Sequence, residues 1–213
     1  MSETTPILAA AILAGGQASR YGGMAKGLLE IAPGVSIMGR LIAELRAARL
    51  TEIVVAANTS EPYQHLGLGV LADLRPPCGP LGGVEAALSF YGPEWDATLF
   101  LPCDLPAITR QEIVRLRGAF VTSDAEVAMC VTGDGPQPLC AVVRNRLLPE
   151  VRAALEAGEL SARRLWRRLG AVEVPFAEAA PFHNVNCPED FDPWLSRGQP
   201  GVTYHAERAA EYA

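Results

Sequence analysis

A loop rich in glycine and carrying two cations is the segment of this sequence best suited to holding a polyanion. Residues 13–27 read LAGGQASRYGGMAKG and contain five glycines, Arg20 and Lys26, directly after an apolar run. Glycine lets backbone N–H groups come close to phosphate oxygens, and the two cations add positive charge at fixed offsets. The segment therefore predicts a phosphate-binding loop.

The spacing within this loop does not fit the two common nucleotide-binding loops. A P-loop needs glycine directly before its lysine and Ser or Thr after it, whereas Lys26 lies between Ala25 and Gly27. The dinucleotide fingerprint GxGxxG is absent too, because Gly15 and Gly16 are adjacent and residue 18 is alanine. A nicotinamide-dependent dehydrogenase is therefore a remote interpretation.

One carboxylate is placed to bind a metal ion next to such a loop. Asp104 lies in LPCDLP (101–106), just past an apolar run, with prolines on both sides. Aspartate in this position often forms a turn or caps a helix, but Thr109 directly precedes the helical pattern RQEIVRLR and competes for the cap. Magnesium prefers one or two carboxylates plus substrate phosphates, so Asp104 is our candidate ligand for Mg²⁺ as the cofactor.

The elements that must position these residues alternate between strand and helix. Apolar runs typical of buried strands cover residues 7–13, 52–57, 97–101, 126–131 and 138–143. Helical periodicity covers residues 36–50, 79–91, 109–120, 146–158 and 161–170. This alternation predicts an α/β fold, a single-domain Rossmann-like three-layer α/β/α sandwich with a mostly parallel sheet. Ligands of such sheets bind beyond the carboxyl ends of the strands, which is where the glycine loop and Asp104 fall.

Length and composition fit one domain of this kind and exclude several other classes of protein. The chain has 213 residues, so we expect a domain over residues 1–195 and a loosely ordered tail over 196–213. The net charge of −6 gives no general attraction to nucleic acid or to an anionic membrane. The five cysteines are odd in number and form no CxxC, which indicates neither a disulfide framework nor a zinc site and favours a reducing cytoplasm.

Several motifs together carry a resemblance to a known family. The string LAGGxxSRxGxxxK, followed by GPLGG (79–83) and CDLP (103–106), resembles nucleotidyltransferases that make sugar nucleotides, cytidyl-diphospho intermediates and molybdenum cofactor dinucleotides. Two later segments, GDGPQPLCAVV (133–143) and FHNVNCPEDF (182–191), are similar to the acceptor-side segments of the molybdenum cofactor guanylyltransferases, a MobA-like family. The resemblance spans residues 13–194, with Ala25 standing where that family typically has aspartate.

The resemblance implies a nucleotide-diphospho-sugar transferase type of fold and a Mg²⁺-dependent reaction. GTP and the terminal phosphate of molybdopterin or Mo-molybdopterin would give the guanine dinucleotide cofactor and pyrophosphate. Transient contacts with other cofactor-assembly proteins would accompany this role. The implied catalytic residues are Arg20, Lys26 and Asp104. The implied nucleotide-binding residues are Leu13, Ala14, Gly15, Gly16, Lys26, Asn58, Asp73, Gly79 and Asp104. The implied acceptor-binding residues are Gln137, Pro138, Asn184 and Asn186.

Two other functions are compatible with the same residues. A cytidylyltransferase acting on molybdopterin or on an isoprenoid precursor would share the loop, but those relatives usually have alanine where this chain has Gly15. The smaller glycine leaves more room and backbone access for guanine, which favours GTP. A non-catalytic nucleotide-binding module would need the glycine loop but neither Asp104 nor the acceptor segments. Mg²⁺-dependent release of pyrophosphate distinguishes the module from either enzyme.

Overall fold

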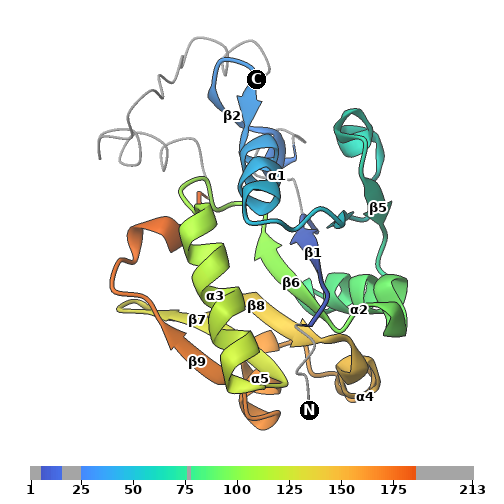
Figure 1. Ribbon diagram of the computed structural model, residues 1–213. Helices are drawn as coiled ribbons and strands as arrows, with labels where there is room; N and C mark the ends of the chain where they lie inside the picture. The colour runs from blue at the N-terminus through green and yellow to red at the C-terminus, as the bar shows by residue number, and fades with distance from the viewer. Residues whose placement is uncertain (1–5, 16–24, 76–77, 186–213) are drawn as a thin grey trace.

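Helices and strands alternate along most of the chain in the computed structural model, which describes residues 6–15, 25–75 and 78–185 (Figure 1). The strands are β1 (Leu8–Leu13), β2 (Glu30–Ala32), β3 (Val35–Ser36), β4 (Ile53–Ala56), β5 (Gly69–Leu71), β6 (Ala97–Pro102), β7 (Val127–Thr132), β8 (Gly135–Arg144) and β9 (Val172–Pro175). The α-helices are α1 (Ile37–Ala47), α2 (Pro80–Tyr91), α3 (Arg110–Ser123), α4 (Leu148–Glu156) and α5 (Ala162–Arg168). The 3-10 helices are η2 (Lys26–Leu28), η3 (Glu61–Leu66), η4 (Gly92–Glu94), η5 (Asn145–Leu147) and η6 (Ala180–Phe182).

The central sheet has the strand order β5-β4-β1-β6-β8-β7-β9 over the described residues. β1 pairs in parallel with β4 on one side and with β6 on the other, and the pairs β4–β5 and β7–β9 are parallel as well. β8 is the exception, because it runs antiparallel to both β6 and β7. The sheet is mostly parallel, as the alternation of strands and helices predicts.

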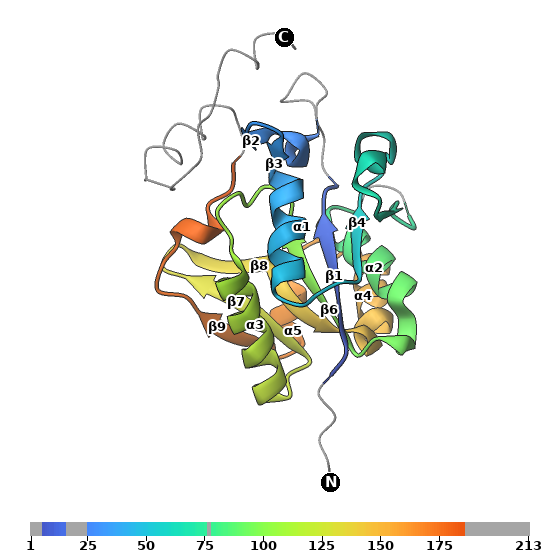
Figure 2. The ribbon, with the colours of Figure 1, turned by 45° about the horizontal axis from the view of Figure 1, so that its top comes forward.

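Helices cover both faces of this sheet and form the outer two layers of the sandwich. Figures 1 and 2 show α1 and α3 on one face, with α2, α4 and α5 on the other. Each face has its own apolar cluster, one built around α1 and α3 and the other around α2, α4 and Trp166 of α5. The central strands are buried from both sides, which explains their uninterrupted apolar sequences.

The sequence did not reveal every strand. The edge strands β5 and β9 and the β2–β3 hairpin have three, four, three and two residues, too few to show periodicity. The strand expected over 138–143 begins earlier, at Gly135, because it pairs with β7 across a turn. The tail expected over 196–213 lies outside the described residues. Within the described ranges, no helix combines the length and the apolar character needed to cross a bilayer.

The strand register brings several loops to one edge of the sheet. Leu13, the last residue of β1, pairs with Ala56 of β4 and with Pro102 of β6, so the chain leaves these three strands at the same level. β8 is antiparallel, so it begins near this edge instead of ending there. Figure 2 shows β1 pointing toward the β2–β3 hairpin at this edge. The glycine-rich loop and LPCDLP therefore emerge side by side.

Candidate functional site

The last residues of β1 are joined to the neighbouring strands by backbone hydrogen bonds. The Ala14 amide donates to the Ala56 carbonyl (2.8 Å), and the Cys103 amide donates to the Leu13 carbonyl (3.0 Å). Gly15 follows directly, and space around its Cα is open. This fixes the start of the glycine-rich loop between the ends of β4 and β6. The candidates Gly16 and Arg20 lie outside the described residues.

Lys26 and Asp104 are brought together although they are far apart in the sequence. The Lys26 Nζ lies 4.0 Å from the Asp104 Oδ2. Lys26 opens η2, and a Cβ added to Gly27 in the same turn would lie 3.0 Å from the Met38 Cε and 3.3 Å from the Cys103 Cβ. Glycine at position 27 therefore permits the close approach that sets Lys26 beside the loop carrying Asp104.

The Asp104 carboxylate is partly buried and incompletely satisfied. Among the described residues, its Oδ1 is a buried side-chain oxygen without a hydrogen-bond partner. Burial raises the pKa of Asp104 above its usual value, and the positive charge of Lys26 opposes only part of this shift. A buried charge with an unsatisfied lone pair is unfavourable unless a cation reaches it. A cation placed next to Oδ1 would therefore stabilise the ionised carboxylate.

The surroundings of Asp104 limit how such an ion would be held. The described residues contain no group of three or more His, Cys, Asp and Glu side chains able to bind a metal. Mg²⁺ commonly keeps several waters and is bound through one or two carboxylates together with substrate phosphates. A single aspartate at a phosphate site fits that pattern, whereas it would not hold zinc on its own.

The cysteine next to Asp104 is not equipped for nucleophilic chemistry. Cys103 is buried, and this burial raises the pKa of its thiol to about 12, with the neighbouring Asp104 charge adding to the effect. Only the thiolate is an effective nucleophile, and an elevated pKa leaves almost none at neutral pH. Cys103 is therefore no candidate for a covalent catalyst beside Asp104.

Asn58 and Asp73 form a second polar pair at the same edge, beyond β4 and β5. The Asn58 Nδ2 donates to the Asp73 Oδ2 (3.0 Å), and the Asp73 amide donates to the Asn58 Oδ1 (2.8 Å). Gly82 in the first turn of α2 lies against this pair, since a Cβ there would be 2.8 Å from the Asp73 Cγ. The helix start, Asp73 and Asn58 consequently form one packed unit.

The N-terminus of α2 borders a small hollow at this edge. Gly79 precedes the helix with φ +60° and provides no side-chain cap, and Pro80 is the first helical residue. The hollow is lined by Leu13, Gly15, Ala56, Asp73, Gly79, Pro80 and Gly83. A helix start without a side-chain cap presents N–H groups and the positive end of its dipole, an arrangement that favours an anion.

The candidate acceptor residues come to this edge on the other side of Asp104. Gln137 and Pro138 lie in the first half of β8, and the Pro138 carbonyl accepts a hydrogen bond from the Trp166 Nε1 (2.9 Å). Asn184 is exposed, and the amide of the next residue, Val185, donates to the Asp104 carbonyl (2.9 Å). The segment of Asn184 is therefore joined directly to Asp104, whereas Gln137 and Pro138 lie on β8, the strand next to β6. Asn186 lies outside the described residues.

A buried ion-pair network that the sequence did not reveal joins the segment after Asp73 to the helices α2 and α4. Glu85 of α2 is only 1% exposed and accepts hydrogen bonds from the Nε and Nη2 of Arg75, both at 2.9 Å. Arg152 of α4 adds a contact of 3.3 Å from its Nε. Arg75 is two residues from Asp73, so the network anchors that loop to α2 and α4. The available signal was a glutamate inside the otherwise apolar stretch VEAAL (84–88).

Comparison with known proteins gives consistent results. The family model of the MobA-like NTP transferase domain matches residues 10–173. The molybdenum cofactor guanylyltransferase of Photobacterium profundum is 32% identical over 180 residues, covering 84% of this chain and 91% of the relative. That of Burkholderia vietnamiensis is 33% identical over 196 residues, covering 87% and 94%.

A solved structure with the same fold bears a related description. Molybdopterin-guanine dinucleotide biosynthesis protein A from Archaeoglobus fulgidus superposes with a TM-score of 0.70 at 21% sequence identity. The match covers 89% of this chain and 99% of that chain. The expected nucleotidyltransferase type of sandwich is therefore confirmed by the fold of this neighbour.

Replacing Gly82 with alanine should destabilise the protein. The new Cβ would clash with the Asp73 carboxylate, and overpacking of this kind costs about 1 to 3 kcal/mol of unfolding free energy. Urea denaturation measures the change. Gly118→Ala is the matched control, because a Cβ at that position in α3 meets nothing within 4 Å. Equal stabilities of the two variants would show that Gly82 does not pack against Asp73 in solution.

Replacing Glu85 with glutamine should lower the unfolding free energy by about 2 kcal/mol, since it weakens the hydrogen bonds that this buried side chain accepts from Arg75 and Arg152. Glu156→Gln is the control, because Glu156 contacts the same arginine, Arg75, at 3.6 Å but its side chain is 66% exposed. Exposed ion pairs contribute at most about 1 kcal/mol. Denaturant unfolding of both variants distinguishes the two cases, and a smaller effect for Glu85 than for Glu156 would contradict the anchoring role.

Proposed function

Because the chain belongs to the MobA-like NTP transferase family, we propose that it transfers GMP from GTP to the terminal phosphate of molybdenum-bound molybdopterin and releases pyrophosphate. The names of the relatives from Photobacterium profundum and Burkholderia vietnamiensis support this choice of reaction. The observation that carries the proposal is the buried, unsatisfied carboxylate of Asp104 beside Lys26 at the rim of the sheet. A phosphoryl transfer site needs such a juxtaposition of a metal-binding carboxylate and a cation.

The nucleotide would occupy the rim between the ends of β1 and β4. Gly15 and Gly16 would offer backbone groups to the base and phosphates, directly after Leu13 and Ala14, which would border the nucleotide, with Asn58 and Asp73 on the far side. The uncapped start of α2 after Gly79 adds a favourable field for negative charge. The polyphosphate is thus received by amides and a helix end in a protein whose net charge would otherwise repel it.

Charge neutralisation is the main catalytic task, because the acceptor phosphate and the triphosphate are both anions. Asp104 would hold Mg²⁺, which when bound screens the phosphate oxygens and withdraws electron density from phosphorus. Lys26 and Arg20 would stabilise negative charge that develops on the departing pyrophosphate. No protein nucleophile is required, in keeping with the raised pKa of the Cys103 thiol. The acceptor phosphate is itself an ionised nucleophile, so the residues mainly orient it.

The acceptor would lie across Asp104 from the nucleotide. Gln137 and Pro138 at the start of β8, together with Asn184 and Asn186, would bind the pterin side of molybdopterin. Because the Val185 amide is hydrogen-bonded to the Asp104 carbonyl, a shift of the segment that carries Asn184 would also shift Asp104. A reducing compartment such as the cytoplasm is the proposed location of this reaction, since the chain has an odd number of cysteines and no CxxC.

The reaction can be tested with the purified protein, Mg²⁺, molybdopterin and each nucleoside triphosphate in turn. We expect release of pyrophosphate with GTP and an acceptor-dependent guanine dinucleotide product, identified by mass spectrometry. Preferential turnover of CTP would make the protein a cytidylyltransferase. Binding of GTP with no pyrophosphate release would indicate a nucleotide-binding module.

Asp104→Asn should separate activity from stability. The variant should lose about 100-fold or more of kcat, because asparagine keeps the shape but loses the charge that binds the ion. It should unfold at the same or a higher temperature than the wild type without metal, since burial raises the pKa of Asp104 and the ionised carboxylate therefore disfavours folding. Mg²⁺ with GTP should raise the melting temperature of the wild type more than that of the variant. Near-normal turnover by the folded variant would remove Asp104 from the metal site.

A further inference from the structure

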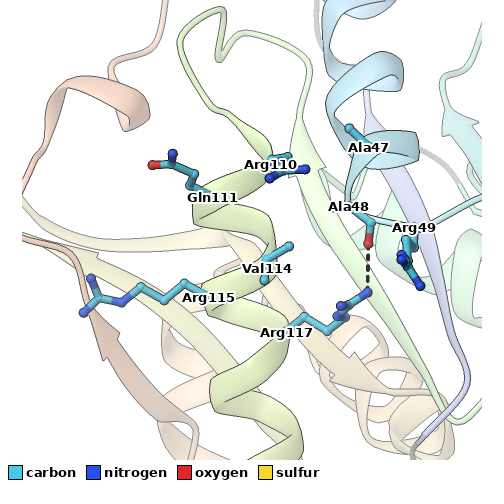
Figure 3. Close-up of a pocket in the computed structure, with 8 residues that line it drawn as sticks. All are labelled: Ala47, Ala48, Arg49, Arg110, Gln111, Val114, Arg115 and Arg117. Carbon is cyan, nitrogen blue, oxygen red and sulfur yellow. Dashed lines mark hydrogen bonds between the residues drawn. The ribbon is translucent and has the colours of Figure 1, made fainter.

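A groove of about 550 Å³ runs between the C-terminal end of α1 and the first half of α3, on the outer side of this helix layer (Figure 3). Four arginines line it: Arg49, Arg110, Arg115 and Arg117. No acidic residue is among the residues that line it, although the whole chain carries a net charge of −6. The groove is therefore a local concentration of positive charge on an acidic protein.

Two of these arginines are already held in place by the protein. The Arg117 Nη1 donates to the Ala48 carbonyl (2.8 Å), and Arg115 donates to the Pro175 carbonyl while its guanidinium stacks 4.7 Å from the centre of the Phe176 ring. These contacts are to neutral groups, and neither side chain forms an ion pair within the described residues. Side chains that are ordered in advance lose less entropy when a ligand binds.

The other two arginines carry charge that the described residues do not neutralise. Arg49 and Arg110 are exposed, and neither forms an ion pair within the described part of the chain. The nearby carboxylate of Glu44 is already engaged, because it accepts from the Arg110 amide (2.7 Å) and lies 3.7 Å from Arg40. The guanidinium groups of Arg49 and Arg110 are therefore available to pair with an anion.

The backbone of Arg49 adopts a conformation that is unfavourable for a residue with a side chain. Arg49 has φ +63°, in the left-handed region, where it ends α1 through hydrogen bonds from its own amide to Arg46 and from Leu50 to Leu45. Glycine or asparagine is favoured at this position after a helix. Strained residues are frequent at functional sites, and here the strained position places a guanidinium in the lining of the groove.

The arrangement fits an extended acidic chain better than a single small anion. Figure 3 shows Arg110 and Arg117 directed toward α1, whereas Arg115 extends to the opposite side of α3. Val114 lies among them and is 42% exposed, so the surface is not uniformly polar. The first amides of α3 are already occupied by Glu44 and Thr109, which leaves no helix end for a phosphate.

We propose that this α1–α3 groove docks an acidic segment of a partner protein, with carboxylates on Arg49, Arg110 and Arg117 and an apolar side chain on Val114. Bidentate pairing of guanidinium with carboxylate gives such an interface direction as well as affinity. Docking on the outer side of α1 and α3 leaves the rim beyond β1, β4 and β6 accessible. The segment can therefore bind while the site at Asp104 is working.

The proposal is tested with a short fluorescein-labelled peptide of glutamates with a leucine at every fourth position, titrated with the full chain near physiological salt. We expect saturable binding that weakens about tenfold or more in Arg49→Glu/Arg110→Glu. The matched control is Arg163→Glu/Arg167→Glu, the same change of charge on the exposed surface of α5, on the opposite face of the sheet. It should bind as the wild type does.

A third variant separates the role of the Arg49 side chain from folding. Arg49→Gly should raise the melting temperature, because glycine accepts the left-handed backbone, yet should weaken peptide binding. The proposal is overturned if the wild type does not bind the peptide, if both double variants lose binding equally, or if Arg49→Gly binds as tightly as the wild type. The proposal is also overturned if an RNA oligonucleotide or tripolyphosphate displaces the labelled peptide as well as the unlabelled peptide does, because the groove would then recognise charge alone.

Discussion

The arrangement of the site depends on how the fold treats two buried carboxylates. Glu85 is almost completely enclosed, and two arginines satisfy it with hydrogen bonds of ordinary length. Asp104 is also partly withdrawn from water, but one of its oxygens lacks a hydrogen-bond partner among the described residues, and the Lys26 Nζ lies 4.0 Å from the other. A buried charge costs several kcal/mol when it is not compensated. Among the described residues, the fold therefore compensates Glu85 with two arginines and leaves Asp104 only partly compensated.

The position of Asp104 is maintained by backbone contacts that its own chemistry does not influence. The preceding residue, Cys103, is hydrogen-bonded to β1, and the Asp104 carbonyl accepts from Val185. The following helix, α3, begins with a complete capping box formed by Thr109 and Glu112, so the loop is closed at both ends. Backbone contacts and the helix cap therefore hold the Asp104 carboxylate in a partly buried position that is unfavourable for its charge.

Much of this arrangement could be predicted from the sequence, for physical reasons that also explain what could not. Strands buried on both faces, such as β1 and β6, have unbroken apolar sequences, and the ends of parallel strands meet at one edge, so Gly15 and Asp104 were placed correctly relative to the sheet. The short edge strands β5 and β9 carry too few residues for a pattern. The Arg75–Glu85 network joins a loop to a helix interior, and nothing in the local spacing specifies which arginine meets which glutamate. The grouping of Arg49 with Arg117 depends on how two helices pack, which only the tertiary structure reveals.

The placement of β1 in the middle of the sheet has a consequence for synthesis of the protein. The ribosome produces this apolar strand first, and β4 can cover one of its edges after α1 has emerged. Its other edge remains open until β6 has been made, and β8 must then enter antiparallel beside β6. While the residues between β1 and β6 are being synthesised, this strand therefore exposes unpaired backbone N–H and C=O groups along one edge, a state in which association between neighbouring nascent chains competes with folding.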